Sequence, residues 1–217
     1  MPPQIKICGL STPGALATAL DAGADFVGFV NFTRSPRHVE PDAAAVLADV
    51  ARGRAKIVCL TVDAPDTLLD EIVAKVRPDF LQLHGRETPE RVAEIVRRQN
   101  IPAIKAVKVA AAADVALAEH YRGIAAFVLY DAKVDEAAAG LLPGGNGVAF
   151  DWRLLAGVAA QGPFMLSGGL NAGNVAEAVR LTSAAMVDVS SGVESAPGVK
   201  DNEKIRDFVK AARVVLT

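Results

Sequence analysis

Short runs of β-branched and aliphatic residues alternate along the chain with longer amphipathic segments. The short runs have the length and composition of buried strands and lie at 5–8, 25–30, 56–61, 79–83, 103–107, 126–130, 163–166 and 185–190. Each precedes a segment with helical spacing, at 12–22, 41–51, 65–76, 88–99, 111–120, 151–160, 172–182 and 201–215. Start signals such as Thr12 before Pro13 and Thr88 before Pro89 support these boundaries. The pattern predicts a series of strand–helix units.

Units of similar length favour a closed barrel over an open sheet. Strands that alternate with helices form a parallel sheet covered by helices. Eight units in 217 residues have about 27 residues each, near the smallest size of a (β/α)8 TIM barrel. The alternative is an open doubly wound sheet, but CGLSTPG (8–14) replaces the glycine-rich phosphate loop expected there. We expect an α/β fold in which residues 1–217 form one barrel domain, with 137–147 as a loop in the sixth unit.

Composition narrows the class of protein without indicating its chemistry. Hydrophobic residues make up 51% of the chain and the formal net charge is only −2, which disfavours a nucleic-acid partner. The N-terminus lacks a secretory pattern, and no apolar run reaches the length of a membrane span. Cys8 and Cys59 are far apart and form no CxxC motif, so a disulfide framework or zinc site is not expected. We expect a soluble, cytoplasmic protein without a metal site.

Catalytic groups of a barrel gather where the strands end, and the first two units offer candidates there. Lys6 and Cys8 share one face of the first strand, and we expect both to point into the barrel. Cys8 is either a reactive thiol or a small buried hydrophobe, which is the commoner role of a free cysteine. Arg37 follows the second strand and could bind a carboxylate or phosphate through two hydrogen bonds, or be a solvated surface residue.

Polar residues also end the fourth, sixth and eighth strands. Gln82 and His84 share a face that should point inward, although the histidine could be structural. Asp131 has the position of a general acid, and also that of a common turn former. Asp188 should point inward, where an unpaired carboxylate is costly. We therefore expect Asp188 to form an ion pair with Lys6 where the last and first strands meet. This pair would be structural in the first place, and it could also set the electrostatic field around Cys8.

The strongest binding signal lies after the seventh and eighth strands, where SGGL (167–170) and SSGV (190–193) occur. Glycines let the backbone approach a ligand closely, and these two loops of a barrel frequently bind phosphate. A simple turn would have to explain both places, so phosphate binding is the preferred interpretation. The candidate residues are Gly168, Gly169, Ser190, Ser191 and Gly192.

Several segments together resemble the phosphoribosylanthranilate isomerase family. They are KICGL (6–10), GADFVGFV (23–30), SPRHV (35–39), LQLHG (81–85), GLNAGNVAEAV (169–179) and VDVSSGVESAPGVKD (187–201), and the resemblance runs from residue 6 to about residue 208. It implies a (β/α)8 barrel and an aldose–ketose isomerase of L-tryptophan biosynthesis. The implied reaction is the Amadori rearrangement of N-(5'-phosphoribosyl)anthranilate to 1-(2-carboxyphenylamino)-1-deoxyribulose 5-phosphate, which needs no metal or redox cofactor.

The resemblance also implies roles for particular residues. Cys8 would be the general base and Asp131 the general acid. Arg37 would lie near the anthranilate carboxylate, and the glycines and serines of SGGL and SSGV would surround the phosphate. His84 would line the mouth of the barrel. One departure is the loop GGNGVAFDW (144–152) with KVDEAAAGLLP (133–143) before it, which leaves open how the loop closes over substrate.

Alternative functions remain at the level of sequence. Indoleglycerol-phosphate synthase would share the phosphate loops, but it is expected to use an inward lysine as its acid and to carry an N-terminal extension. A non-catalytic barrel that binds a phosphorylated ligand would be expected to lack Cys8 or Asp131. The sequence does not decide between a monomer and a homodimer, nor whether the related aminoaldose of histidine biosynthesis is a second substrate.

Overall fold

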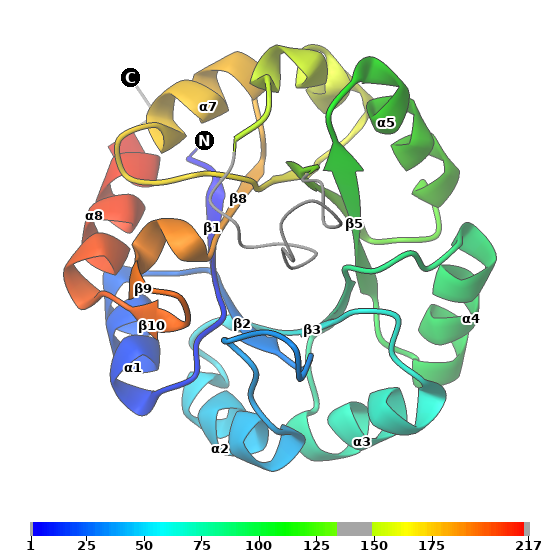
Figure 1. Cartoon of the computed structure of the whole chain (residues 1–217), viewed down its shortest axis with the longest axis vertical. Coiled ribbons are helices and arrows are strands. Elements are labelled where there is room, and N and C mark those ends of the chain that lie inside the picture. The colour runs from blue at the N-terminus through cyan, green and yellow to red at the C-terminus, as the bar shows by residue number, and fades with distance from the viewer. Residues whose placement is uncertain (1, 134–148, 215–217) are drawn as a thin grey trace.

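The computed structural model describes residues 2–133 and 149–214 and has a closed parallel barrel at its centre (Figure 1). Its strands are β1 (Gln4–Cys8), β2 (Phe26–Val30), β3 (Lys56–Thr61), β4 (Phe80–Leu83), β5 (Ala103–Val109), β6 (Phe127–Ala132), β7 (Met165–Leu166) and β8 (Met186–Val189). Each strand pairs in parallel with the next, and β1 also pairs with β8. The predicted closed barrel is confirmed, and the open sheet is excluded.

Helices form a ring around the strands (Figure 1). They are α1 (Pro13–Ala22), α2 (Pro41–Ala51), α3 (Asp66–Val76), α4 (Pro89–Gln99), α5 (Ala112–Leu117), α7 (Val175–Thr182) and α8 (Asn202–Arg213), and the 3-10 helix η1 (Ala118–Tyr121) continues α5. The predicted start signals work locally, because the hydroxyls of Thr12 and Thr88 accept hydrogen bonds from backbone N–H groups in the first turns of α1 and α4. None of the helices in the described part of the chain has the length and apolar character to cross a membrane.

In the sixth strand–helix unit, the helix predicted from the sequence is not a single α-helix. The helix expected at 151–160 is two short 3-10 helices, η2 (Trp152–Leu155) and η3 (Val158–Gln161). Gly157, between them, has a left-handed backbone conformation with φ of 84°, which a continuous α-helix does not accommodate. The loop expected at 137–147 lies outside the described residues.

An unpredicted hairpin follows β8. The 3-10 helix η4 (Ser191–Val193) leads into β9 (Glu194–Ala196), which pairs antiparallel with β10 (Val199–Lys200) before α8 begins. The two strands are joined at Gly198, whose φ is 82°. This hairpin places charged side chains beside the barrel mouth.

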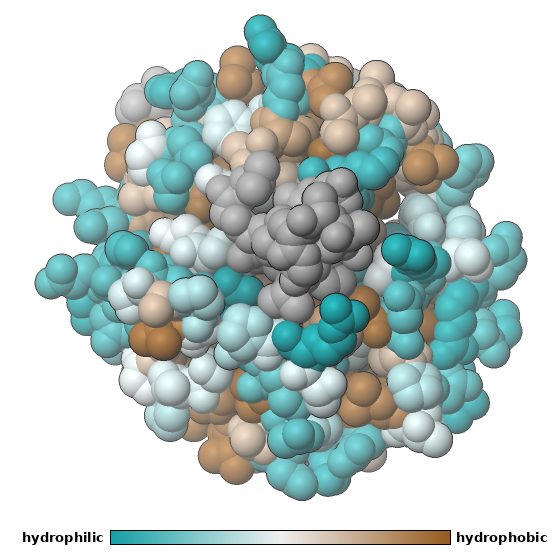
Figure 2. Space-filling view, in the orientation of Figure 1, coloured by the Kyte–Doolittle hydropathy of each residue, from teal (hydrophilic) through white to brown (hydrophobic). Residues whose placement is uncertain are grey.

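Alternation along the strands separates two packing layers. The interior of the barrel holds a cluster of apolar residues, namely Phe26, Val58, Ile104, Ala106, Leu129, Met165 and Met186. The opposite faces of the strands pack against the helices in a larger cluster. By the same alternation, the inner residues at the carboxyl ends of β4, β5, β6 and β8 are polar, so the apolar cluster supports a partly polar layer above it. On the face shown in Figure 2, hydrophilic residues cover much of the outer ring.

Candidate active site

The junction between β1 and β8 holds a buried ion pair. Lys6 and Asp188 are paired in register on the two strands, and the Lys6 Nζ donates a hydrogen bond to Asp188 Oδ1 at 2.8 Å. The Ser167 hydroxyl, after β7, donates to Asp188 Oδ2 at 3.2 Å. The predicted Lys6–Asp188 contact is therefore present. Because both carboxylate oxygens have a donor, the buried charge is compensated.

Cys8 is the next inward-facing residue after Lys6 on β1, and the Lys6–Asp188 pair affects the pKa of its thiol. Burial raises the pKa of the Cys8 thiol; the positive charge of Lys6 lowers it in part, and Asp188 raises it further. Burial disfavours the charged form of Lys6, but the negative charge of Asp188 and its hydrogen bond outweigh this effect and raise the pKa of the ammonium group. The lysine therefore stays charged beside a thiol whose raised pKa favours the protonated form.

Among the described residues, Cys59 has no charged neighbour that opposes the effect of burial on its pKa, whereas Lys6 opposes it for Cys8. It belongs to the cluster between strands and helices, and burial raises its pKa to about 12. Cys59 is therefore a core residue.

Gly28 on β2 makes room for both reactive side chains. A Cβ atom at this position would lie 3.0 Å from Cys8 Sγ and 3.2 Å from Lys6 Cε. Sequence reasoning missed this residue, although a glycine between two inward apolar positions of a strand is a signal of close approach.

On the other side of the mouth, Gln82, His84 and Asp131 form one hydrogen-bonded chain. His84 Nε2 is 3.1 Å from Asp131 Oδ2, and Gln82 Nε2 is 2.9 Å from His84 Nδ1. Asp131 Oδ1 accepts a hydrogen bond from the N–H of Ala132 at 3.0 Å. All three of these side chains are buried. The structure therefore brings together two predicted site residues, Asp131 on β6 and His84 after β4. Around the barrel, β7 and β8 separate Asp131 from Cys8.

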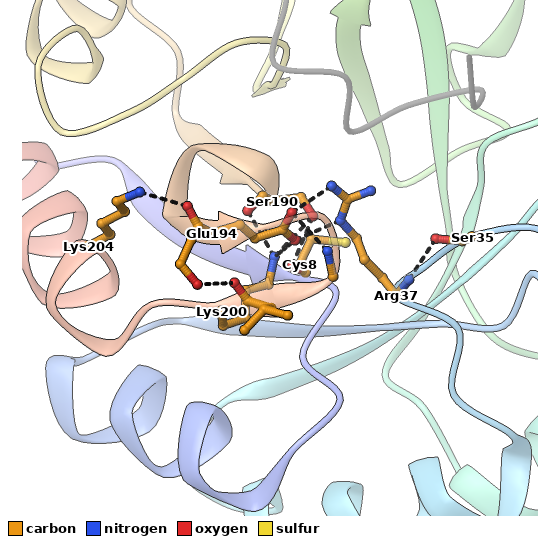
Figure 3. A network of polar contacts seen from close by, with 10 residues as sticks. Cys8, Ser35, Arg37, Ser190, Glu194, Lys200 and Lys204 are labelled. Carbon is orange, nitrogen blue, oxygen red and sulfur yellow. Dashed lines mark hydrogen bonds and ion pairs between the residues drawn. The ribbon is translucent and has the colours of Figure 1, made fainter. Parts of the chain in front are cut away.

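Arg37 lies at the mouth and is buried, which rules out the solvated surface alternative (Figure 3). Its Nε and Nη2 donate to the two carboxylate oxygens of Glu194 at 2.7 and 2.8 Å. Lys200 Nζ donates to Glu194 Oε1 at 2.7 Å. Burial raises the pKa of Glu194, but the hydrogen bond from Arg37 and the charge of Lys200 outweigh it, so the net shift is downward. Glu194 is thus a carboxylate that holds two cations.

The hairpin connects this cluster to the cysteine strand. Lys200 Nζ donates to the carbonyl oxygen of Ser190 at 2.8 Å and to its hydroxyl at 3.2 Å, and the Ser190 hydroxyl donates to the carbonyl oxygen of Cys8 at 3.2 Å (Figure 3). Burial lowers the pKa of Lys200, with Glu194 opposing the shift. Sequence reasoning missed Glu194 and Lys200. The signal was present as two charged residues that flank the Pro-Gly pair of a hairpin turn.

The two predicted phosphate loops lie against each other. A Cβ atom at Gly192 would lie only 1.9 Å from the carbonyl oxygen of Leu170, so the backbones are in direct contact. Gly168 and Gly169 have φ of 84° and 66°, and a Cβ at Gly168 would lie 3.1 Å from Asp131 Oδ1. The predicted residues Gly168, Gly169, Ser190, Ser191 and Gly192 are thus gathered between the cysteine strand and the aspartate strand.

The mouth therefore offers a thiol, a carboxyl group and an arginine around one opening. Within residues 2–133 and 149–214, no three His, Cys, Asp or Glu side chains are grouped as a metal site would require. The arrangement suits proton transfer to and from a bound anion by two separate groups.

Known proteins resemble the chain over nearly its whole length. The family model for N-(5'-phosphoribosyl)anthranilate (PRA) isomerase matches residues 5–211. An N-(5'-phosphoribosyl)anthranilate isomerase of Brucella canis is 55% identical over 208 residues, which are 96% of this chain and 93% of the relative.

Two solved structures show the same similarity. A phosphoribosyl anthranilate isomerase in complex with reduced 1-(o-carboxyphenylamino)-1-deoxyribulose 5-phosphate superposes with a TM-score of 0.84 at 32% identity, over 97% of this chain and 98% of the other. Monomers generated from the dimeric phosphoribosylanthranilate isomerase of Thermotoga maritima give a TM-score of 0.83 at 32% identity, with the same coverage.

Proposed function

The chain belongs to the phosphoribosylanthranilate isomerase family, and we propose that Cys8 is the general base and Asp131 the general acid of its reaction. The enzyme isomerises N-(5'-phosphoribosyl)anthranilate to 1-(2-carboxyphenylamino)-1-deoxyribulose 5-phosphate in L-tryptophan biosynthesis. Two placements carry the assignment of roles: a thiol lies beside a lysine on β1, and a carboxyl group on β6 lies beside a histidine that follows β4.

Asp131 starts the reaction by protonating the ring oxygen of the ribose. The bond between C1′ and that oxygen breaks, and the lone pair of the anthranilate nitrogen forms a Schiff-base cation. Cys8, as thiolate, then removes the proton from C2′. The electrons of that C–H bond form a double bond between C1′ and C2′, and the electrons of the C=N bond return to nitrogen. The resulting enolamine tautomerises to the ketone.

The electrostatics around Cys8 suit the second step better than the first. Burial raises the pKa of the Cys8 thiol. The Schiff-base cation formed in the first step brings a positive charge next to the sulfur, and Lys6 supplies another from below. Nearby positive charge stabilises a thiolate, so the base becomes available when its substrate proton has become acidic.

Substrate binding is assigned to the polar groups around these two residues. We assign the anthranilate carboxylate to Arg37, which Glu194 holds at the mouth through two hydrogen bonds. The phosphate is assigned to the loops after β7 and β8, where Gly168, Gly169 and Gly192 allow the backbone to approach a ligand. Ser190 and Ser191 complete this set. His84 supports Asp131, and Lys6 with Asp188 supports Cys8.

The test is a fluorescence assay that follows the loss of phosphoribosylanthranilate. Cys8→Ala and Asp131→Ala should each lower kcat by about 10²-fold or more with little change in KM. Arg37→Ala should mainly raise KM. Cys59→Ala is the matched control, because this second buried cysteine lies outside the barrel interior, and it should keep normal kinetics. Near-normal turnover of Cys8→Ala or Asp131→Ala would refute the corresponding role.

We also propose that the enzyme works in the cytoplasm as a monomer or a homodimer. The solved Thermotoga maritima relative is described as dimeric, which supports the second possibility. Size-exclusion chromatography with light scattering should give one or two chain masses, and a larger assembly would contradict the proposal.

A further inference from the structure

We propose that Gln82 is a positioning residue whose amide rotates to match the protonation of His84 to the acid function of Asp131. The proposal rests on the assignment of Asp131 as general acid. It starts from the hydrogen-bonded chain of the three side chains, with distances of 2.9 Å from Gln82 Nε2 to His84 Nδ1 and 3.1 Å from His84 Nε2 to Asp131 Oδ2.

The orientation in the structure corresponds to one proton on the His84–Asp131 pair. An amide NH2 group can only donate, so His84 Nδ1 must be an unprotonated acceptor. The neutral imidazole then carries its proton on Nε2 and donates to Asp131, which is a carboxylate. Asp131 cannot act as an acid from this state, because taking the Nε2 proton would leave an imidazolate anion.

A second proton changes this only if the amide turns. When Nδ1 is protonated it needs an acceptor, and a rotation of about 180° brings Gln82 Oε1 to the place of Nε2. The proton between His84 Nε2 and Asp131 Oδ2 can then move onto Asp131, because the imidazole left behind is neutral. Donation to the substrate ring oxygen leaves one proton on the pair, and solvent supplies the next.

The surroundings of Gln82 permit this rotation. Its Oε1 atom is buried and has no hydrogen-bond partner among the described residues. Turning the amide therefore exchanges one hydrogen bond to His84 for another and breaks no further bond of the oxygen. The side chain itself is fully buried on β4, so water does not substitute for it freely.

Other charged groups face the same polar layer. Lys108 on β5 is in register with Asp131, and Cys8, Lys6 and Asp188 come from β1 and β8. All of them are unchanged in the variants proposed below, so differences between variants report on Gln82.

The direct test is NMR of the enzyme labelled with 15N-histidine. The chain has three histidines, and His84→Asn identifies the signals of His84. In the wild type we expect an unprotonated Nδ1 at alkaline pH and a protonated Nδ1 once the second proton binds. An Nδ1 that stays unprotonated across the pH range of activity would overturn the proposal, and this measurement needs no variant that could fail to fold.

Two variants should move the midpoint of Nδ1 protonation in opposite directions. Gln82→Met removes the acceptor and should lower the midpoint by about one pH unit, with kcat about tenfold lower near pH 7 and KM within about threefold. Gln82→Glu supplies a permanent acceptor and should raise the midpoint. Thr61→Val is the control, because this buried hydroxyl also lacks a partner among the described residues but, in register with Leu83, belongs to the outer face of the sheet. It should shift neither the midpoint nor kcat.

The outcomes separate this proposal from the assignment of the acid. If Asp131→Asn retains turnover, Asp131 is not the acid, whatever the titration shows. If Asp131→Asn is inactive but the midpoint is the same in wild type, Gln82→Met and Gln82→Glu, then the role of Gln82 is refuted while the acid remains assigned.

Discussion

Replacing Lys6 by methionine should cost far more stability than the ion pair itself contributes. At 2.8 Å the gross attraction between Lys6 and Asp188 is about 6 kcal/mol for an effective dielectric constant of about 20. Removing each ion from water costs several kcal/mol, so the intact pair nearly balances. The variant Lys6→Met keeps the desolvated Asp188 carboxylate but leaves it only the Ser167 hydroxyl as a side-chain partner among the described residues. We expect a loss of about 3–5 kcal/mol in the free energy of unfolding.

Urea denaturation with linear extrapolation measures this loss. Arg54→Met is the matched control, since Arg54 lies 2.7 Å from Asp21 but the two side chains are 48% and 73% exposed. An exposed pair of this kind contributes less than about 1 kcal/mol. The double variant Lys6→Met with Asp188→Asn removes the stranded charge and should recover at least half of the loss.

Either of two results would refute the reasoning. If Lys6→Met loses no more stability than Arg54→Met, burial does not govern the energetics of the pair. If the double variant is as unstable as Lys6→Met, the loss comes from packing of the lysine side chain and not from the unpaired carboxylate.

Three further results are expected. First, kcat/KM should keep rising with pH above the ordinary thiol pKa of about 8.5, because a base must be deprotonated and burial raises the pKa of Cys8. Iodoacetamide at pH 8 should label Cys8 before Cys59 in peptide mass spectrometry, and equal labelling would contradict the difference in environment. Second, Glu194→Gln should raise KM about tenfold with kcat nearly unchanged, because Arg37 loses the charged partner that orients it. Steady-state kinetics measure both constants, and an unchanged or lower KM would show that Glu194 merely competes with substrate for Arg37. Third, Gly192→Ala should lower the free energy of unfolding by about 1–3 kcal/mol in urea titrations, because the new Cβ would overlap a carbonyl oxygen of the loop after β7. A variant as stable as the wild type would mean that the loops after β7 and β8 separate at little cost.

Local patterns predicted those parts of the site that lie on one strand. The period of two placed Lys6 with Cys8, and Gln82 with His84, on inward faces, and all four are buried there. The same pattern on the last strand predicted that Asp188 would need Lys6. The closed barrel made this possible by bringing the first and last strands together.

Where the prediction was wrong or incomplete, the deciding contacts were not local. The helix expected at 151–160 is divided by a single glycine whose left-handed conformation is not encoded by amphipathic spacing. The contact of Arg37 with Glu194 was not predicted, because the two residues are 157 positions apart. The joining of His84 to Asp131 crosses 47 positions and the intervening strand β5.

The sequence by itself determined the number of units, the inward direction of the reactive side chains and the family, because these depend on short-range periodicity and on motifs that keep their order. The strand pattern also predicted the pairing of Asp188 with Lys6, which the structure confirms. Only the tertiary structure decided the other charge contacts, of Glu194 with Arg37 and Lys200 and of Asp131 with His84. The physical reason is that burial makes the energy of a charge depend on its nearest partner in space. Closure of the barrel selects that partner from strands and loops that are distant in sequence.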